Sequence, residues 1–381
     1  MTTLNYCSLP SCNYDSDILL DSTYYAAMSV NYSTIDTLII GQGLAGSILA
    51  WQLMKSGQKT MVISDDASPS ASRVAAGLFN PVTGKRLVLQ THAETIIPAA
   101  QALYRELETH FNQRFFHKKS MLRVIMDAKE HKSFEKRSKD PDYAQYLGEI
   151  CNPLVSLNKS NEVFEQHNTG YLDTNRLLDC LRGYFIAQGS YRAALFNHND
   201  LVITDEIISW SGIKTQRIIF CEGFMGKDNP WFNWLPFQPT KGEILSLKTD
   251  AEMPDRIING GKWMLPVHDG SYKTGATYDH DLSTITPSES GKRELIDGMQ
   301  KLLSSPIEFE LQDHQAGVRP NTLDKQPFIG LHPEQPEIGI FNGFGSKGSM
   351  LIPYYSAAFA RHLIDNSPIP AEADICRIQH G

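Results

Sequence analysis

The sequence predicts a mixed α/β (α+β) fold that combines a βαβ unit with a region of mainly antiparallel sheet. Residues 35–66 supply the βαβ unit: an apolar strand enters a glycine-rich turn, a segment with helical apolar spacing follows, and a second buried strand closes the unit. Residues 242–248 alternate as a half-buried strand, and residues 263–278 are predicted as two hairpin strands. These three observations determine the expected fold class.

The turn of the βαβ unit has the spacing GxGxxG, with glycines at positions 41, 43 and 46. Gly41 permits a tight turn, Gly43 lets the backbone approach a pyrophosphate, and Gly46 lets the helix pack close to the strand. The helix N-terminus would present free N–H groups to phosphates, and Asp65 stands where a carboxylate takes ribose hydroxyls. An ordinary glycine turn is the alternative, but strand, helix, second strand and acid together favour a dinucleotide site.

Composition describes a globular protein with room for two domains. The chain has 381 residues, 41% hydrophobic and 20% charged, with a net charge of −8. No stretch approaches the roughly 18 apolar residues of a membrane span, and the acidic balance argues against a general nucleic-acid surface. Six cysteines without CxxC spacing indicate neither a zinc site nor a disulfide framework. We therefore expect a soluble, cytoplasmic protein with no metal and no membrane partner.

The first 33 residues differ from the rest of the chain. They are rich in Ser, Asn, Asp and Tyr, and they lack both a basic residue and an apolar segment of signal-peptide length up to Tyr32. We expect a disordered extension over residues 1–33. Met28 lies shortly before the first strand and is a candidate translation start.

A basic run lies between Phe116 and Lys139, with eight Lys or Arg residues against three acids. It suits either a docking face for an acidic partner or a solvated helix face, and the acidity of the whole chain favours the solvated face. Farther along, residues 171–175 lead into a predicted capped helix over residues 177–189, and residues 217–220 predict a strand that ends near Gly223.

The predicted hairpin turns at Asp269 and Gly270, which is a two-residue turn signal. Such a turn sets His268 opposite Ser271 and, by alternation, Trp263 opposite Ala276. One face of the hairpin would then carry five side chains: Trp263, Leu265, Thr274, Ala276 and Tyr278. The two aromatic residues of that face would wall a ligand pocket or pack in the core.

The last third of the chain carries two further signals. Arg319 and Pro320 lie in a loop before an apolar pair, and an arginine offers a planar fork of donors for a carboxylate, although a surface salt bridge is the alternative. A second GxGxxG spans residues 343–348 and opens a predicted helix over 349–364. No strand or ribose acid follows this helix, so the loop predicts a helix N-terminus aimed at an electron-rich group.

With both glycine loops, the Arg-Pro loop and the hairpin, the chain from about residue 35 to residue 363 resembles the FAD-dependent oxidoreductases of the D-amino-acid oxidase / glycine oxidase (DAO) superfamily. The resemblance implies a Rossmann-like FAD-binding domain assembled from three chain segments, 34–100, 167–236 and 317–366. An inserted, mainly antiparallel substrate domain would comprise residues 101–166 and 237–316. Family members that bind FAD covalently use a cysteine in the Arg-Pro loop, where this chain has Gly317 and Val318, so non-covalent FAD is implied.

The resemblance also implies roles for individual residues. The family usually has its ribose-binding acid at the position of Ser64, so either Ser64 or Asp65 would contact the ribose, and Ser346 stands where glycine oxidase carries a second arginine. The candidate cofactor-binding residues are Gly41, Gln42, Gly43, Leu44, Ala45, Gly46, Ser64, Asp65, Ser72, Arg73, Ala75, Ala76, Gly77, Gly223, Gly343, Gly345, Ser346, Lys347 and Gly348. The candidate catalytic residues are Arg319, Tyr278, Trp263 and Lys347.

The activity implied by the resemblance is oxidation of an amine, an amino acid or an N-substituted glycine, to an imine by hydride transfer to flavin N5. Arg319 would hold the substrate carboxylate, and molecular oxygen is a candidate electron acceptor. His268 and Tyr278 are candidate bases, while Lys347 would stabilise reduced flavin, assist oxygen, or simply lie in solvent. Two alternatives stay open: an FAD enzyme that removes a carboxymethyl group from tRNA, docked through the basic run, and a non-catalytic flavin-binding protein.

Overall fold

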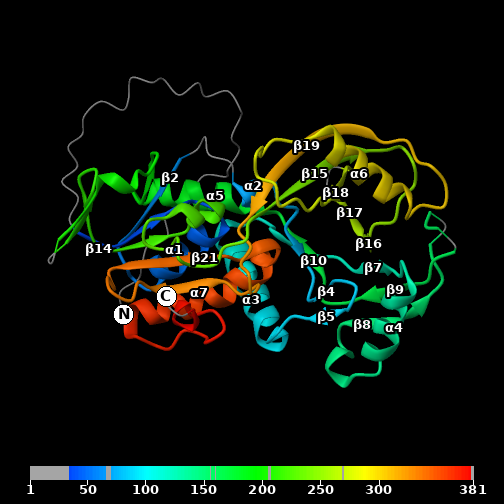
Figure 1. Ribbon diagram of the computed structural model, residues 1–381, viewed down its shortest axis with the longest axis horizontal. Helices are drawn as coiled ribbons and strands as arrows, with labels where there is room; N and C mark the ends of the chain where they lie inside the picture. The colour runs from blue at the N-terminus through cyan, green and yellow to red at the C-terminus, as the bar shows by residue number, and fades with distance from the viewer. Residues whose placement is uncertain are drawn as a thin grey trace. The chain divides into compact units, whose positions relative to one another are not determined.

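A computed structural model describes residues 34–65, 70–154, 156–158, 160–204, 207–267 and 270–378 (Figure 1). The predicted extension over residues 1–33, with Met28, lies outside the described residues, as does His268 in the hairpin turn. None of the described helices is long and apolar enough to cross a membrane.

The βαβ unit is confirmed and forms the centre of an eight-stranded sheet, here called sheet A. β1 (Ile35–Ile40) pairs in parallel with β2 (Thr60–Ser64) on one side and with β14 (Ile213–Phe220) on the other. Both faces of β1 are covered from residue 37 to residue 40, which explains its apolar run Leu38, Ile39 and Ile40. The other strands of sheet A are β11 (Tyr191–Ala193), β12 (Leu201–Ile203), β13 (Ile208–Trp210), β20 (Phe328–Leu331) and β21 (Ile338–Asn342).

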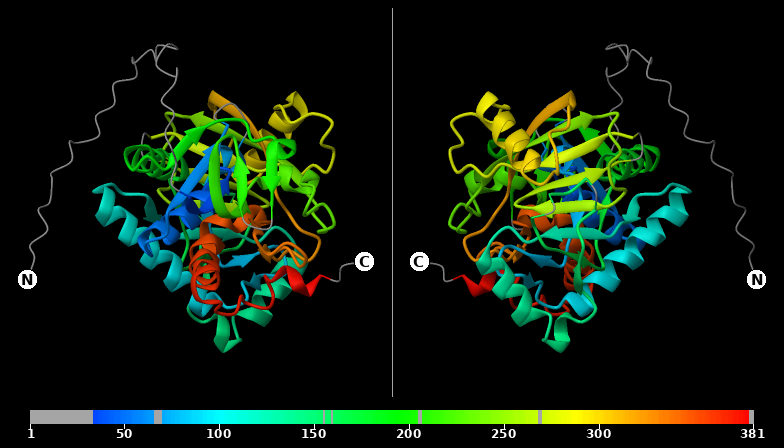
Figure 2. Two further views of the ribbon diagram at one scale, coloured as in Figure 1. Left: turned by 90° about the vertical axis from the view of Figure 1, so that its left-hand side faces the viewer. Right: turned by 90° about the vertical axis from the view of Figure 1, so that its right-hand side faces the viewer.

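Helices from distant parts of the chain pack on sheet A. α1 (Leu44–Lys55) follows the glycine turn after β1 and contacts both α5 (Thr174–Ala187) and α7 (Gly348–Asp365). α3 (Ala93–Phe111) lies alongside α7, as Figure 2 shows. One hydrophobic core joins these helices to the sheet. The ends of β1, β14 and β21 thereby meet the N-termini of α1 and α7.

A second eight-stranded sheet, sheet D, is antiparallel except where β16 runs parallel to β7, in agreement with the predicted antiparallel part. Its strands in spatial order are β19 (Glu310–Arg319), β15 (Thr240–Lys248), β18 (Tyr272–Gly275), β17 (Lys262–Pro266), β16 (Ile257–Gly260), β7 (Met121–Val124), β9 (Val163–Gln166) and β8 (Leu147–Cys151). α6 (Glu289–Gln300) packs on β15 and β17, and α4 (Ala128–Arg137) packs by Phe134 against Phe164 of β9.

Short elements complete the fold. α2 (Ala71–Val74) follows β2 after residues that are not described. Two small sheets consist of β3 (Leu78–Phe79), β10 (Gly170–Leu172) and β6 (Phe116–Lys118), and of β4 (Val82–Thr83) with β5 (Val88–Leu89).

The predicted register of the β17–β18 hairpin is wrong by one residue. Trp263 pairs with Gly275 instead of Ala276, and Met264 pairs with Thr274. At the end of the hairpin, Val267 pairs with Ser271 instead of Tyr272, because the Val267 N–H donates to the carbonyl of Ser271 at 3.0 Å. Thr274 therefore lies on the face of Met264, opposite the face that carries Trp263.

Candidate active site

A cavity of about 580 Å³ lies where the carboxyl ends of β1, β2 and β14 meet the N-termini of α1 and α7. Such a crevice is where ligands of open parallel sheets bind. The cavity brings together most of the predicted site residues: Gly41, Gln42, Gly43, Leu44, Ala45, Ser64, Asp65, Ser72, Arg73, Ala75, Ala76, Gly77, Gly223, Trp263, Arg319, Gly345, Ser346 and Gly348. Gly46, Tyr278, Gly343 and Lys347 do not line it.

In the first glycine loop, the backbone comes close to that of neighbouring segments. Gly41 has φ +106°, and a Cβ at this position would lie 2.5 Å from the carbonyl oxygen of Cys221. A Cβ at Gly46 would lie 2.0 Å from the carbonyl oxygen of Gly41, so Gly46 serves the packing of helix on strand. The first turn of α1 has no acidic residue and its N-cap residue is Gly43, so no negative charge of α1 itself occupies the positive end of the helix dipole. These features fit the pyrophosphate of a dinucleotide.

Three polar side chains surround this helix end. Ser72 Oγ accepts a hydrogen bond from the Leu44 N–H at 3.0 Å. Arg73 lines the cavity, but its guanidinium also makes a 2.5 Å ion pair with Asp179 of α5. Arg182 is a lining residue that the sequence did not identify, and its Nε donates to Gln42 Oε1 at 3.1 Å. Two guanidinium groups therefore border a cavity suited to an anionic ligand.

Acidic groups lie at the ends of β2 and β14. Ser64 and Asp65 both line the cavity, so either can face a ribose. Glu222 was not identified from the sequence, although it directly follows the strand before Gly223. Its carboxylate lies 2.9 Å from His198 Nε2 and accepts a hydrogen bond from Asn229 at 2.8 Å.

The second glycine loop places the start of α7 against the cavity. Gly345 and Ser346 line the cavity, whereas Gly343 packs against Thr322, to which a Cβ would come within 2.8 Å. The first turn of α7 contains no acid and has no side-chain cap. The predicted helix N-terminus aimed at an electron-rich group thus has the geometry that it needs.

Lys347 is half-buried and turned toward β5. Its Nζ donates to Oε1 of Gln90 at 2.8 Å. Burial lowers the pKa of Lys347, and the cation of Lys325 lowers it further. The contact with Gln90 ties the start of α7 to the chain just after β5.

Arg319, the last residue of β19, presents a half-buried guanidinium to the cavity. It donates to the carbonyl oxygens of Thr277 and Lys241 at 3.3 and 3.4 Å. No carboxylate of a described residue lies within 4.0 Å of it. Burial lowers the pKa of Arg319, while the nearby Tyr278 acts in the opposite direction, and a guanidinium stays charged regardless. A desolvated cation without an acidic partner is suited to an anionic ligand.

Tyr278 and Asn321 form the outer side of the Arg319 site. The Tyr278 ring lies over the guanidinium, 5.3 Å from ring centroid to Cζ, and its side chain is 62% exposed. Asn321 Nδ2 donates to the Tyr278 hydroxyl at 2.8 Å and to Thr240 Oγ1 at 2.5 Å. Trp263 lines the cavity with its indole against Gly275.

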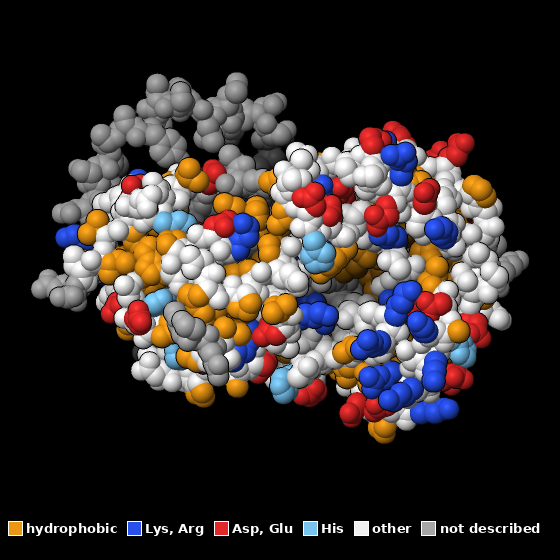
Figure 3. Space-filling model, in the orientation of Figure 1, with side chains coloured by type: hydrophobic (Ala, Val, Ile, Leu, Met, Phe, Trp, Pro, Cys, Tyr) orange, Lys and Arg blue, Asp and Glu red, His pale blue; other side chains and the backbone are white. Residues whose placement is uncertain are grey.

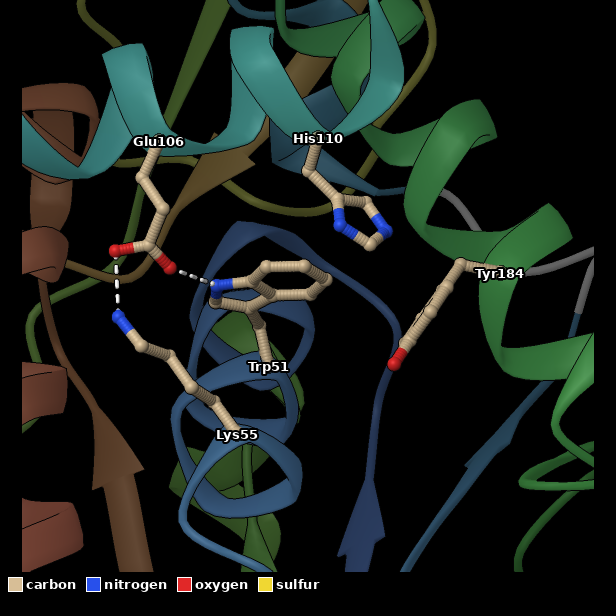
Figure 4. A pocket seen from close by; sticks show the side chains of 5 residues that line it. All are labelled: Trp51, Lys55, Glu106, His110 and Tyr184. Atoms are coloured by element: carbon tan, nitrogen blue, oxygen red, sulfur yellow. Dashed lines mark hydrogen bonds and ion pairs between the residues drawn. The ribbon is translucent and has the colours of Figure 1, made fainter. Parts of the chain in front are cut away.

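A second pocket, of about 460 Å³, lies apart from this site between α1, α3 and α5 (Figure 4). Glu106 accepts from Trp51 Nε1 at 2.9 Å and from Lys55 Nζ at 2.5 Å. The Trp51, His110 and Tyr184 rings contact one another with centroids 4.8–5.3 Å apart. Since Glu106 is paired with Trp51 and Lys55 and the three rings pack together, we attribute this pocket to helix packing and assign it no ligand.

Comparison with known proteins defines the class to which this fold and site belong. The family model described as FAD dependent oxidoreductase (DAO) matches residues 36–362. The chain belongs to this family, and FAD is therefore its cofactor. The glycine loops and acid-free helix ends described above fit that cofactor.

Individual relatives are more distant. Glycine oxidase of Bacillus licheniformis is 23% identical over 377 residues, which cover 88% of this chain and 95% of the relative. The tRNA 5-methylaminomethyl-2-thiouridine biosynthesis bifunctional protein MnmC of Marinobacter nauticus is 24% identical over 83% of this chain, and this chain spans about half of its length, 53%.

Among solved structures, iminodiacetate oxidase from Chelativorans sp. BNC1 matches with a TM-score of 0.74 and 19% identity, covering 88% of this chain and 96% of the other. Glycine oxidase from Bacillus cereus matches over the same shares with a TM-score of 0.72 and 18% identity. These likenesses establish the shared fold.

Proposed function

We propose that the protein oxidises the amine of an amino acid or N-substituted glycine to an imine with FAD as the acceptor. The observation that carries this proposal is Arg319, a half-buried guanidinium at the cavity with no acidic partner among the described residues. A substrate carboxylate would supply the missing counter-charge in a charge-assisted, bidentate contact. An amine substrate without a carboxylate would leave the Arg319 guanidinium without a counter-charge.

The cofactor would be held at both ends of the cavity. Gly41, Gly43 and the N-terminus of α1 would hold its pyrophosphate, and the N-terminus of α7 would stabilise negative charge at the other end. Ser64 or Asp65 would accept from the ribose. When bound, FAD supplies the acceptor for the hydride that leaves the substrate carbon.

The chain itself would bind and orient the substrate. Arg319 would hold the carboxylate, Tyr278 would cover the outer face of the guanidinium, and Trp263 would form a wall that excludes water. The substrate enters the reaction as a neutral amine, loses a hydride from the carbon beside nitrogen, and releases a proton from the resulting iminium. Water then hydrolyses the imine.

The relatives support this substrate class. Glycine oxidase and iminodiacetate oxidase are named for substrates that are glycine or a glycine with a carboxymethyl group on nitrogen. Both substrates place a carboxylate next to the carbon that would lose hydride. Ser346 stands where the resemblance to glycine oxidase implies a second arginine, so Arg319 would be the main carboxylate anchor and a simple small amino acid fits less well.

Anaerobic bleaching of the purified, yellow holoprotein tests the proposal. Glycine, N-methylglycine and N-carboxymethylglycine should be compared with methylamine and dimethylamine, which lack the carboxylate. Bleaching by at least one of the carboxylates, and not by the matched amines, is expected. Failure of all amino acids and N-alkyl glycines to bleach the flavin would contradict this proposal and leave two readings: a substrate carried by RNA, or a non-catalytic flavin-binding protein. Re-admission of air then tests oxygen as the acceptor.

A second candidate is the same oxidation of an amine carried by tRNA. It is favoured by the match to the tRNA-modifying protein, which covers 83% of this chain. The carboxylate of a carboxymethylamino group would bind Arg319 as a free amino acid would. This candidate requires a surface for the RNA outside the cavity.

A further inference from the structure

Four lysines form a straight stripe on the outer face of α4 and its C-terminal end. Lys129, Lys132, Lys136 and Lys139 recur at spacings of 3, 4 and 3 residues, and all four side chains are exposed. This spacing places Lys129, Lys132 and Lys136 on one side of α4, over roughly 10 Å of its length, and Lys139 follows in the turn after the helix. Blue side chains gather over α4 at the lower right of Figure 3. We call these four residues the lysine stripe.

The lysine stripe lies in a basic part of an otherwise acidic protein. Residues 116–139 carry eight basic and three acidic residues, whereas the whole chain has a net charge of −8. Of the three acids in this run, Glu130 is buried and paired with Arg123 at 2.5 Å, Asp127 pairs with Lys85 at 2.8 Å, and Glu135 is exposed beside His131. None of the four lysines lies within 4.0 Å of a described carboxylate. Lys85, on the β4–β5 turn, is ion-paired at 2.8 Å with Asp127 at the N-cap of α4, so its charge is compensated and does not count toward the stripe.

We propose that the lysine stripe docks the phosphate backbone of a folded RNA. The proposal rests on the tRNA form of the proposed function, which is why RNA and not DNA is the occupant. Lysines act as point charges toward phosphates, and a row of them without interleaved aromatic residues fits backbone contact and not stacking on single-stranded bases.

Other partners fit this surface less well. A membrane-bound helix needs an apolar face toward the lipid, but the large apolar residue of α4, Phe134, is buried against Phe164. A protein interface needs aromatic or aliphatic anchors, and the exposed face of α4 has none. The partner that best complements a row of lysines is therefore one with a regular array of negative charges.

The position of the stripe implies a large RNA. α4 packs on β9, which is six strands away from β19 and Arg319 in sheet D. At about 4.8 Å per strand the separation is roughly 29 Å. An RNA that reaches both sites must therefore be folded and much longer than a few nucleotides. Trinucleotides should not bind measurably.

Fluorescence anisotropy of a labelled tRNA transcript with the full-length holoprotein tests this surface. The variant replaces all four stripe lysines by glutamine. A matched control replaces Lys59, Lys214, Lys248 and Lys301, which are also exposed, pair with no described carboxylate, and change the charge equally. The stripe variant should lose at least about tenfold in affinity and reduce the slope of log K against log salt by about 3. The control should stay within about twofold of the wild type.

Three results would overturn the proposal. The first is no tRNA binding at low ionic strength, and the second is equal loss in the stripe variant and the control. The third is equal or tighter binding of polyglutamate or of anionic phosphatidylserine vesicles. Bleaching by N-alkyl glycines should be unchanged in the stripe variant, so failure of the docking surface is distinguishable from failure of the flavin chemistry.

Discussion

The guanidinium of Arg319 occupies the space into which a side chain at Gly242 would project. A Cβ at Gly242 would lie 2.1 Å from Nη2 and 2.3 Å from Nη1 of Arg319. Gly242 is on β15, which pairs with β19 and sets Thr240 opposite Arg319. Because Gly242 has no side chain, β15 leaves room for the Arg319 guanidinium. Tyr278 covers the guanidinium from the outer side.

Gly242→Ala should therefore displace the arginine without touching the cofactor loops. We expect KM for a carboxylate substrate to rise by about tenfold or more, because a charge-assisted contact contributes about 1.5–3 kcal/mol. Bound flavin should stay at the wild-type level. Steady-state kinetics and the ratio of flavin to protein absorbance measure both quantities.

The control is Gly183→Ala on α5, where a Cβ would meet no atom within 4 Å. This change should leave KM unaltered and raise stability slightly, since alanine is favoured over glycine inside a helix by about 0.5–1 kcal/mol. An unchanged KM in Gly242→Ala would contradict the inference that the missing side chain at Gly242 makes room for Arg319.

Tyr278 offers a test that separates its ring from its hydroxyl. Tyr278→Phe keeps the ring over Arg319 and removes the hydrogen bond from Asn321, so kcat/KM for the carboxylate should fall only about two- to fivefold. Tyr278→Ala also removes the cation–π contact and should cost about a further tenfold. Equal kinetics of the two variants would mean that the ring does not contribute.

Because α1 packs closely on the first glycine loop, we expect that a methyl group added at Gly46 causes loss of the cofactor. Gly46→Ala would force a Cβ to within 2.0 Å of the Gly41 carbonyl, so the loop must shift. We expect purified Gly46→Ala to contain little FAD and to unfold at a lower temperature than the wild type. Retention of full flavin content and an unchanged Tm would show that the loop tolerates the methyl group and would contradict this packing account.

The hydrogen bonds of Glu243 predict that the stability of the folded protein depends on pH. Burial acts to raise its pKa, but hydrogen bonds from Ser288, His314 and Lys241 outweigh burial and hold the pKa below the usual 4.5. Because the folded-state pKa is depressed, this stabilisation is present above pH 4.5 and is lost as pH falls through the lower, folded-state value.

Glu243→Gln should therefore lower Tm at pH 7, by the equivalent of about 1–3 kcal/mol for a weakened buried charged pair. The difference from the wild type should shrink below pH 4.5. Thermal unfolding of both proteins at several pH values measures the effect. A Tm difference that is constant or grows toward acid would refute the account.

Local patterns in the sequence predicted the elements that border the cavity. The GxGxxG turn, the strand before it and the helix after it are close in sequence, so spacing alone reveals them. The second glycine loop and Arg319 could be found in the same way, and the resemblance to the DAO superfamily joined them into one site. The family match supports that combination.

The missed features depend on contacts between distant segments. Arg182 and Glu222 reach the cavity only because α5 and β14 pack beside the glycine loop, and neither residue has a local signature. Gly242 looks like an ordinary strand residue until β19 pairs with it. The predicted hairpin register was wrong because Asp269-Gly270 suggested a two-residue turn that pairs Val267 with Tyr272, whereas the Val267 N–H donates to Ser271.

The most direct test of the proposed function is anaerobic flavin reduction in Arg319→Met, with the best carboxylate substrate and its decarboxylated amine compared in both proteins. Arg319→Met should keep its FAD, lose at least about tenfold in apparent affinity for the carboxylate substrate, and treat the decarboxylated amine as the wild type does. Unchanged reduction by the carboxylate substrate in a flavin-replete variant would contradict the role of Arg319 and, with it, the proposed class of substrate.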